Sequence, residues 1–420
     1  MSPGKCFVVL SSLLVMFLRD SIFGGSAFAA DADHWPRFRG VNGTGISVQQ
    51  GIPDAWSETD YAWKIRLEYS GHSSPVIWGK KLFVTSANEG GSIRLLHCMD
   101  ADTGTQHWEG TVKLSESPKH LKNSWATSTP TTDGERVYTI FADLQNQIVT
   151  AWNFDGTEAW SRDIGPFGKD HGQGVSPIVS QGLVIVPNDQ PGPSSVMALR
   201  ATDGEVVWTA ERPSASTSFS APLLVPGNHG STQLLCLSQA TGLTSLDLMT
   251  GKLNWQTPPF PLRTVASLIE DRGIVIAYCG QAGNGKYLAA IKASPDVPSE
   301  SRILYERKTQ LPYVPTSIAL DGTLYLWGDS GVISCLELEN GNEVWTKRLA
   351  NVSFSGSPVC IDGRLFGISE AGDVYVVRAS REYQELGKTS LGEGSHSTPA
   401  VANGHLYLRT FHHLMALKAR

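Results

Sequence analysis

Polar and aromatic side chains recur along this chain just before a Ser/Thr-Pro dipeptide, and they are the side chains best suited to chemistry. Two of these phrases, residues 71–75 and 395–399, are near-copies, and each carries a histidine. Imidazole, amide, guanidinium and phenol groups can all hydrogen-bond a ligand. The candidate ligand-binding residues are His72, Asn123, Trp125, His171, Gln173, Arg263, Tyr313 and His396, together with Asp189 at the end of a predicted strand.

Two interpretations of these residues remain open. They could rim a polar, aromatic pocket for a small ligand, a peptide or a glycan, or they could hydrogen-bond backbone groups in crowded inner loops. A metal held by His72, His171 and His396 would need the three to converge, which spacing alone does not show, and we predict no metal site. The chain has no Gly-x-Ser-x-Gly, no His-Glu-x-x-His and no carboxylate pair at a readable spacing, so we assign no catalytic residue.

The elements that would position these residues are marked by a second phrase, Gly-x-x-x-Trp. Successive tryptophans of this phrase lie 47 to 52 residues apart, except for one interval of 90. Trp63 lies a further 45 residues before the first of them. Self-similarity at such a period is typical of a solenoid, a propeller or an array. The phrase ends at Trp108, Trp160, Trp208, Trp255 and Trp345.

The Ser/Thr-Pro dipeptides and their weaker copies mark eight starts of the repeat. Short runs rich in β-branched and aromatic residues follow each start, such as residues 183–186 and 323–326, and Gly, Asp and Asn bound them. Each repeat is typical of four antiparallel strands, which make one propeller blade. The sequence therefore predicts an all-β fold, an eight-bladed β-propeller of four-stranded antiparallel blades, with an insertion over residues 114–124.

The last repeat ends after three strands, and an N-terminal strand is predicted to complete it. Residues 62–67 carry Trp63, which would otherwise be an orphan of the pattern. Closing the ring with this strand removes a free sheet edge, which is an aggregation liability. Two other repeats lack the tryptophan: we predict that Tyr305 replaces it in the fifth, and Leu386 stands at its position in the seventh.

The tryptophans themselves are predicted to be structural. A large aromatic side chain on every outer strand stabilises the contact between neighbouring blades, and its N–H needs an acceptor. The glycine four residues earlier supplies the positive φ of the turn. The predicted blade-docking residues are Trp63, Trp108, Trp160, Trp208, Trp255 and Trp345.

The N-terminus is typical of a cleaved secretory signal peptide. Lys5 precedes a nearly apolar run over residues 6–18, and residues 27–29 read Ala-Phe-Ala. We predict a signal peptide over residues 1–29, an ordered arm over 30–60 and the propeller over 61–420. Because no cysteine stands where it could carry a lipid after cleavage, we expect a soluble secreted or periplasmic protein. No later run reaches membrane length.

Charge and cysteine usage narrow the possible partners. The formal net charge is −6, and no Lys/Arg cluster stands out. This argues against nucleic acid and anionic membranes as partners. The cysteines after the signal peptide fall in different repeats, without metal-site spacing, and are expected to be small buried apolar residues. One disulfide between neighbouring repeats remains open. These cysteines are Cys98, Cys236, Cys279, Cys335 and Cys360.

The two phrases together resemble the repeat of quinoprotein-type, or PQQ-like, β-propellers, over roughly residues 60–420. Residues 35–45, 122–126 and 171–177 resemble a bacterial secreted subgroup of these repeat proteins. The resemblance implies the propeller fold. Its members include quinoprotein dehydrogenases with pyrroloquinoline quinone and calcium on the axis, outer-membrane assembly lipoproteins that act as scaffolds, and receptor kinases. This chain lacks the adjacent cysteine pair, the haem Cys-x-x-Cys-His, the lipid-bearing cysteine and the kinase domain of these groups.

We therefore expect an extracytoplasmic, non-enzymatic β-propeller that acts as a binding or scaffold module, with its ligand or partner at the channel mouth. We expect a monomer without a cofactor or membrane insertion, and a protein partner, small ligand or glycan. The alternative is a pyrroloquinoline-quinone-dependent oxidoreductase, a dehydrogenase. It would need calcium and acidic side chains on the axis, for which Asp189 is the only candidate that we find.

Overall fold

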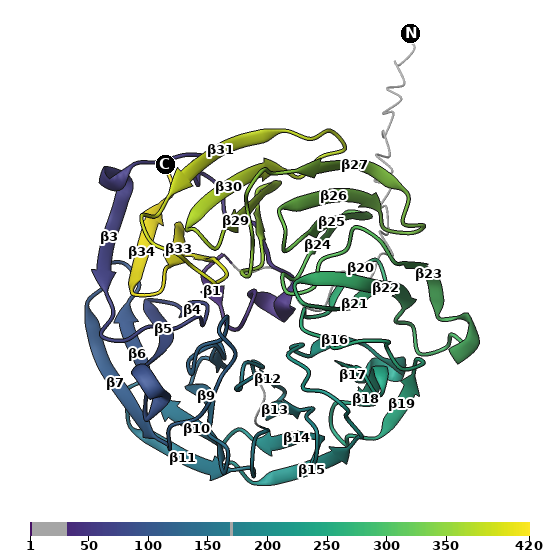
Figure 1. The fold of residues 1–420 in the computed structure, drawn as a ribbon, viewed down its shortest axis with the longest axis horizontal. Helices are drawn as coiled ribbons and strands as arrows, with labels where there is room; N and C mark the ends of the chain where they lie inside the picture. The colour runs from purple at the N-terminus through teal and green to yellow at the C-terminus, as the bar shows by residue number, and fades with distance from the viewer. Residues whose placement is uncertain (2–31, 169–170) are drawn as a thin grey trace.

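The chain forms a ring of eight β-sheets around a central axis in a computed structural model that describes residue 1 and residues 32–168 and 171–420 (Figure 1). Each sheet contains four antiparallel strands, A to D from the axis to the perimeter, which confirms the predicted eight-bladed propeller. The predicted signal peptide, residues 1–29, lies outside the described residues except for its first residue. No helix in the described part is long and apolar enough to cross a membrane.

The strands follow in chain order from blade to blade. Blades 1 to 4 are β4 (Val76–Trp78), β5 (Lys81–Ala87), β6 (Ile93–Asp100), β7 (Gln106–Lys113); β8 (Thr131–Thr132), β9 (Arg136–Ala142), β10 (Gln147–Asn153), β11 (Glu158–Asp163); β12 (Ile178–Ser180), β13 (Leu183–Asn188), β14 (Ser195–Arg200), β15 (Val206–Glu211); and β16 (Leu223–Pro226), β17 (Thr232–Ser238), β18 (Gly242–Asp247), β19 (Leu253–Gln256). Blades 5 to 7 are β20 (Ile269–Asp271), β21 (Ile274–Gln281), β22 (Asn284–Lys292), β23 (Ile303–Arg307); β24 (Ile318–Leu320), β25 (Thr323–Trp327), β26 (Val332–Glu337), β27 (Glu343–Arg348); and β28 (Val359–Ile361), β29 (Arg364–Ile368), β30 (Asp373–Arg378), β31 (Glu385–Ser390). Blade 8 is β32 (Ala400–Ala402), β33 (His405–Arg409), β34 (His413–Lys418) and β3 (Tyr61–Arg66). Single 3-10 turns are η1 (Val41–Gly43), η2 (Glu58–Asp60), η3 (Glu89–Gly91), η4 (Asn228–Gly230) and η5 (Ser299–Ser301).

The ring is closed by β3, as predicted. β3 lies antiparallel to β34, with Trp63 opposite Ala416 and Lys64 opposite Met415. Blade 8 therefore takes its three inner strands from the C-terminal end of the chain and its outer strand from the N-terminal end. In Figure 1 the purple β3 lies beside the yellow β34.

Each outer-strand tryptophan contacts the turn of the following blade. The Trp63 ring covers Gly104, where a Cβ atom would lie 2.8 Å from the ring, and its Nε1 donates to the Ala101 carbonyl at 3.0 Å. Gly104 has φ 72°, so this position favours glycine twice over, through its backbone conformation and through the ring above it. Trp208 repeats the arrangement on Gly251. The Gly and the Trp of the repeat phrase are thus coupled between neighbouring blades.

The degenerate fifth blade shows how this coupling adapts. Because the turn of blade 5 lacks the glycine, Trp255 of blade 4 instead donates to Gln233 Oε1 at 2.7 Å. The Arg302 guanidinium stacks on the Trp255 ring at 4.0 Å. Tyr305, which was predicted to replace the missing tryptophan, lies against Gly341 of blade 6. The contact between blades survives the loss of either member of the phrase.

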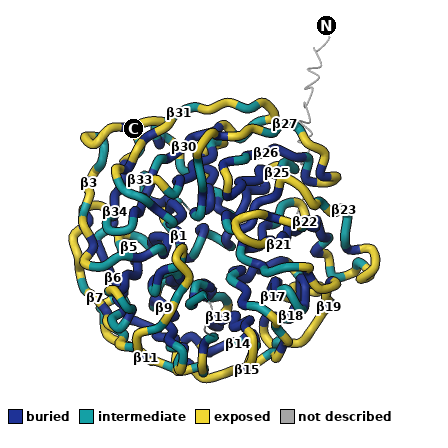
Figure 2. Tube along the Cα trace, viewed as in Figure 1, coloured by how far each residue is buried: buried dark blue, intermediate teal, exposed yellow. Residues whose placement is uncertain are grey.

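The core lies within and between the blades (Figure 2), where strands B and C are almost entirely buried and the outermost strands are largely exposed. The five cysteines of the described residues are buried free thiols, so none of them forms a disulfide with another. Burial leaves them as small apolar residues of the core, the role that was expected of them.

The N-terminal arm is ordered over its described part and crosses the axis of the ring. β1 (His34–Trp35) adds to the inner edge of blade 1, and β2 (Ile46–Ser47) adds parallel to the inner edge of blade 7. Between them, the Asn42 side chain exchanges two hydrogen bonds with the backbone of Leu224 in blade 4. The arm therefore ties together blades from three parts of the ring, and Figure 1 shows it at the centre.

Arg39 fixes the arm on the axis. Its side chain is fully buried and donates to five backbone carbonyls, two of them in the arm and three in blades 6 and 7. The blade carbonyls belong to Thr316, Ser317 and Pro358, at strand A. A guanidinium has five N–H donors, so this one side chain caps the inner ends of two blades at once.

Candidate functional site

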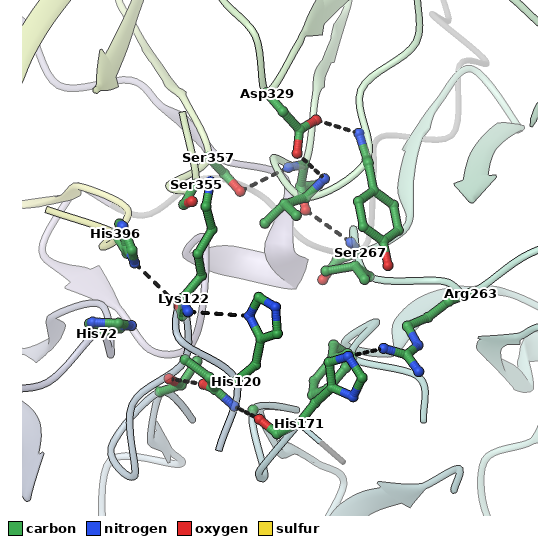
Figure 3. A pocket seen from close by; sticks show the side chains of 18 of the residues that line it. His72, His120, Lys122, His171, Arg263, Ser267, Asp329, Ser355, Ser357 and His396 are labelled. Atoms are coloured by element: carbon green, nitrogen blue, oxygen red, sulfur yellow. Dashed lines mark hydrogen bonds between the residues drawn. The ribbon is translucent and has the colours of Figure 1, made fainter. Parts of the chain in front are cut away.

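A cavity of about 730 Å³ occupies the central channel, and we call it the cup (Figure 3). Residues from all eight blades line it, and Phe38 of the arm lines it as well. The arm hydrogen-bonds strand-A residues at or after the Ser/Thr-Pro dipeptides, whereas most candidate residues precede them. The arm therefore covers one end of the channel, and the candidate loops surround the other.

The hydroxyls of the Ser/Thr-Pro dipeptides, and of their weaker copies in blades 5 and 6, form a ring in the wall of the cup. In each link, a backbone N–H at strand A donates to the hydroxyl oxygen of the next blade, as from Ser74 to Thr129 at 2.9 Å. Seven such links of 2.9 to 3.3 Å run around the axis. The seven hydroxyls belong to Ser74, Thr129, Ser176, Ser267, Thr316, Ser357 and Thr398.

One link of this hydroxyl ring is missing. Blade 4 has Ala221 where the other blades have serine or threonine, and Ala221 lines the cup at the same level. The Ser176 backbone N–H, which would donate to a hydroxyl there, has no hydrogen-bond acceptor among the described residues. The contact between blades 3 and 4 thus lacks the hydrogen bond that joins every other pair of blades at this level.

Six of the nine candidate residues come together in the cup, and three do not. The six that line the cavity are His72, Asn123, His171, Arg263, Tyr313 and His396. Asp189 instead forms a buried ion pair with Arg212, with Oδ1 2.8 Å from Nε. Trp125 donates to the Ser117 carbonyl and packs on Gly91.

Gln173 is buried in the loop before blade 3, where its amide donates to the Val175 carbonyl at 2.7 Å. This side chain satisfies a backbone group, which is the second of the two roles considered for the candidates. Asn123 has both roles, because it lines the cup while its amide donates to the His171 carbonyl at 2.6 Å.

The predicted insertion, residues 114–124, forms a loop over the rim of the cup, and we call it the rim loop. Lys122 reaches from it to Glu370 of blade 7 with a 2.6 Å ion pair. The His396 ring of blade 8 donates from Nδ1 to the Lys122 carbonyl at 3.2 Å, and His120 stacks on His171. Leu121, between these contacts, is 93 % exposed. Figure 3 shows Lys122 extending across the cup from the rim loop.

Burial and nearby cations keep His72 and His396 neutral. Burial lowers the pKa of His72 well below its usual value, and the neighbouring His396, Arg409 and Lys119 lower it further. Burial also lowers the pKa of His396, although Glu370 opposes that shift. These rings are therefore hydrogen-bonding groups at neutral pH rather than cations.

The carboxylates at the cup do not fit a calcium site. Asp329 accepts the backbone N–H groups of Tyr313 and Val314 at 2.7 and 3.1 Å, and burial raises its pKa. Glu370 is bonded to Lys122, Ser353 and Ser355. Among the described residues, no group of three or more His, Cys, Asp or Glu side chains could hold a metal ion. The acidic set that pyrroloquinoline quinone with calcium would need is not assembled here.

Fold and cup together define an eight-bladed propeller of the PQQ-like type. The family described as outer membrane protein assembly factor BamB matches residues 94–326 and 329–419, and the chain belongs to this family. The BamB of Yersinia pestis is 21 % identical over 354 residues, which cover 81 % of this chain and 72 % of that protein.

Two solved structures share the fold. BamB from Moraxella catarrhalis aligns with a TM-score of 0.61 at 14 % identity, over 85 % of this chain and 99 % of its own. The quinohemoprotein alcohol dehydrogenase of Comamonas testosteroni aligns with a TM-score of 0.65 at 12 % identity, over 93 % of this chain and 81 % of its own. At these identities the likenesses show the fold alone.

Several residues of the cup were not among the sequence candidates. Phe38, His120, Lys122 and Asp329 line the cavity without standing next to a Ser/Thr-Pro dipeptide or being singled out by type. Five of the seven ring hydroxyls did have a signal, the recurrence of serine or threonine before proline. That signal was interpreted only as the start of a strand, and the link between blades was missed.

Proposed function

We propose that this protein is a non-enzymatic binding or scaffold propeller that acts outside the cytoplasm in the assembly of outer-membrane proteins. The match of most of the repeats to the BamB family supports this proposal, as does the similarity to the outer membrane protein assembly factor BamB of Yersinia pestis. The predicted signal peptide supports a periplasmic location. The ligand or partner binds at the channel mouth, and the protein acts as a monomer.

Binding at the channel mouth is supported by the convergence of six candidate side chains from separate loops on one cup. The rim loop beside it presents Leu121, which is 93 % exposed. This is the highest exposure of any large apolar side chain in the described part of the propeller. An exposed leucine on a loop that is held at its base by Lys122 and His396 suits contact with a partner. Mouth and rim loop together form one surface for binding.

A rescue experiment tests the assembly role and the mouth separately. The gene is deleted in its own bacterium, and outer-membrane proteins are quantified in the membrane fraction. Rescue is then attempted with the wild type, with Leu121→Glu at the mouth, and with Leu253→Glu as a matched control. Leu253 is 59 % exposed on β19, at the perimeter of blade 4.

We expect the deletion to lower outer-membrane proteins, and the wild type and Leu253→Glu to restore them. Leu121→Glu should fail although it is present at the wild-type level. An unchanged outer membrane after deletion would refute the assembly role. Full rescue by Leu121→Glu would refute the use of the mouth.

The dehydrogenase alternative has its own test. Because the acidic side chains for calcium are not assembled in the cup, we expect pyrroloquinoline quinone with calcium to leave the tryptophan fluorescence of the mature protein unchanged. Saturable one-to-one binding with reduction of a dye by alcohols or sugars would establish the alternative.

A further inference from the structure

The wall of the cup offers hydrogen-bond donors. Each of the seven ring hydroxyls accepts a backbone N–H from the neighbouring blade. Within residues 32–168 and 171–420, none of the seven donates its own proton to a protein atom, and all seven line the cavity. A hydroxyl has one proton to give, so each presents that proton to whatever fills the cup. The hydroxyl ring therefore surrounds the axis with hydrogen-bond donors.

Arg263 adds the donors of a guanidinium to those of the hydroxyl ring. It lines the cup, and one of its N–H groups donates to His171 Nε2. No carboxylate of the described residues lies within 4.0 Å of it, whereas Lys122, the other lysine or arginine in the lining, is paired with Glu370. Four of the five N–H donors of Arg263 therefore remain for a ligand.

Three buried arginines add positive charge around the same axis. Arg37, Arg39 and Arg409 donate to backbone carbonyls of strand A and the loops before it, and none of them has a carboxylate partner in the described part of the chain. Burial lowers their pKa values to about 9, 10 and 9. Positive charge is thus gathered at the axis of a chain whose formal net charge is −6, and such charge favours an anion as ligand.

The carboxylates at the cup are already committed to other groups. The Asp329 carboxylate accepts two backbone N–H groups, and the Glu370 carboxylate is committed to Lys122, Ser353 and Ser355. The ring oxygens each accept a bond already. A neutral sugar brings hydroxyl donors as well as acceptors, and its donors would find no uncommitted carboxylate here.

We propose that the cup binds a small ligand through an oxyanion, a carboxylate or phosphate group, held by Arg263 and the ring hydroxyls. This inference rests on the proposed use of the channel mouth as the binding site. A carboxylate or phosphate oxygen only accepts hydrogen bonds and pairs with guanidinium in a bidentate way. At about 730 Å³ the cavity has the size of a site for a whole small molecule, so the oxyanion is one end of the ligand.

Calorimetric titration of the purified mature protein at low ionic strength tests this assignment. The probes are inorganic phosphate, succinate and, as the neutral probe, glucose. The variants are Arg263→Gln and the matched control Arg200→Gln, which removes the same charge from an exposed turn where Arg200 pairs with Asp203. A third variant, Ala221→Ser, adds a donor to the ring.

We expect phosphate or succinate to bind saturably, and glucose not to bind. Arg263→Gln should weaken binding about 10-fold or more, as loss of a charged hydrogen bond does, whereas Arg200→Gln should leave it unchanged and Ala221→Ser should tighten it. The tighter of the two anions identifies the group as phosphate or carboxylate.

Three results would overturn the proposal: binding of glucose alone, binding of neither anion, or anion binding that Arg263→Gln does not weaken. The rescue experiment with Leu121→Glu involves no oxyanion, so its outcome decides the proposed function independently of these titrations.

Discussion

Replacing Ala221 with serine supplies the hydroxyl that the ring lacks between blades 3 and 4. The Ser176 N–H has no acceptor among the described residues, whereas the equivalent N–H groups donate over 2.9 to 3.3 Å. A new hydrogen bond of this kind contributes about 0.5–1.5 kcal/mol net. The added oxygen enters the open cup, which Ala221 lines, so no overpacking offsets it. We expect a gain of about 1 kcal/mol in the free energy of unfolding.

The assay is urea unfolding followed by circular dichroism. An unfolding entropy of about 2.1 cal/mol/K per residue in a chain this long means that 1 kcal/mol moves Tm by only about 1 °C, so the urea midpoint is the better measure. Thr398→Val is the matched control. It keeps the shape but leaves the Ser357 N–H, now bonded at 2.9 Å, without an acceptor, and should cost about 1–3 kcal/mol. No gain from Ala221→Ser together with a loss below about 0.5 kcal/mol from Thr398→Val would refute the stabilising role of the ring.

Three further expectations concern stability and thiol reactivity. Trp208→Ala should cost about 3–5 kcal/mol in urea unfolding, because the ring covers Gly251 of the next blade; a loss under about 1 kcal/mol would contradict the docking role. The five buried thiols, whose pKa values burial raises to about 11 or 12, should react with a disulfide reagent only after unfolding; labelling of the folded protein would be the contrary result. Burial opposes the ionisation of Glu393, but hydrogen bonds from Thr410, His413 and His412 outweigh it and lower its pKa to about 2. Since an unfolded Glu titrates near 4.3, the ionised Glu393 stabilises the fold above that pH and loses this effect as the pH falls through about 2. Glu393→Gln should therefore be less stable than the wild type at pH 6 and close to it at pH 2, and an equal gap at both pH values would count against the assignment.

The repeat predicted the fold because each blade carries its own signals. The tryptophan spacing placed Trp63 in the last blade, and Tyr305 could be recognised at a position where the phrase had lost its tryptophan. Both inferences needed only local patterns and a period. The structure confirms the blade that Trp63 completes and places Tyr305 against Gly341.

Only part of the cup could be predicted from the sequence, because its residues meet across separate blades. Asp189 follows a strand as Asp329 of the cup does, and nothing local reveals that Arg212, after the next two strands, binds its carboxylate. Lys122 and Glu370 are neighbours only in the closed ring. The plugging of the channel by Arg39 depends on carbonyls from blades 6 and 7. Such pairings have no periodicity, so no pattern within one repeat could predict them.

The strand that closes the ring also sets a constraint on the order of folding. β3 is synthesised early and β34 last, yet they are neighbours in blade 8. The sequence separation of this pair is close to the largest that the chain allows. Pairing β3 with β34 therefore costs much loop-closure entropy, and we expect this step to come late and folding to be slow. Until then β3 has an unpaired hydrogen-bonding edge, and the unfinished propeller is exposed to aggregation. A single short strand therefore stays without its partner until nearly the whole chain has been made.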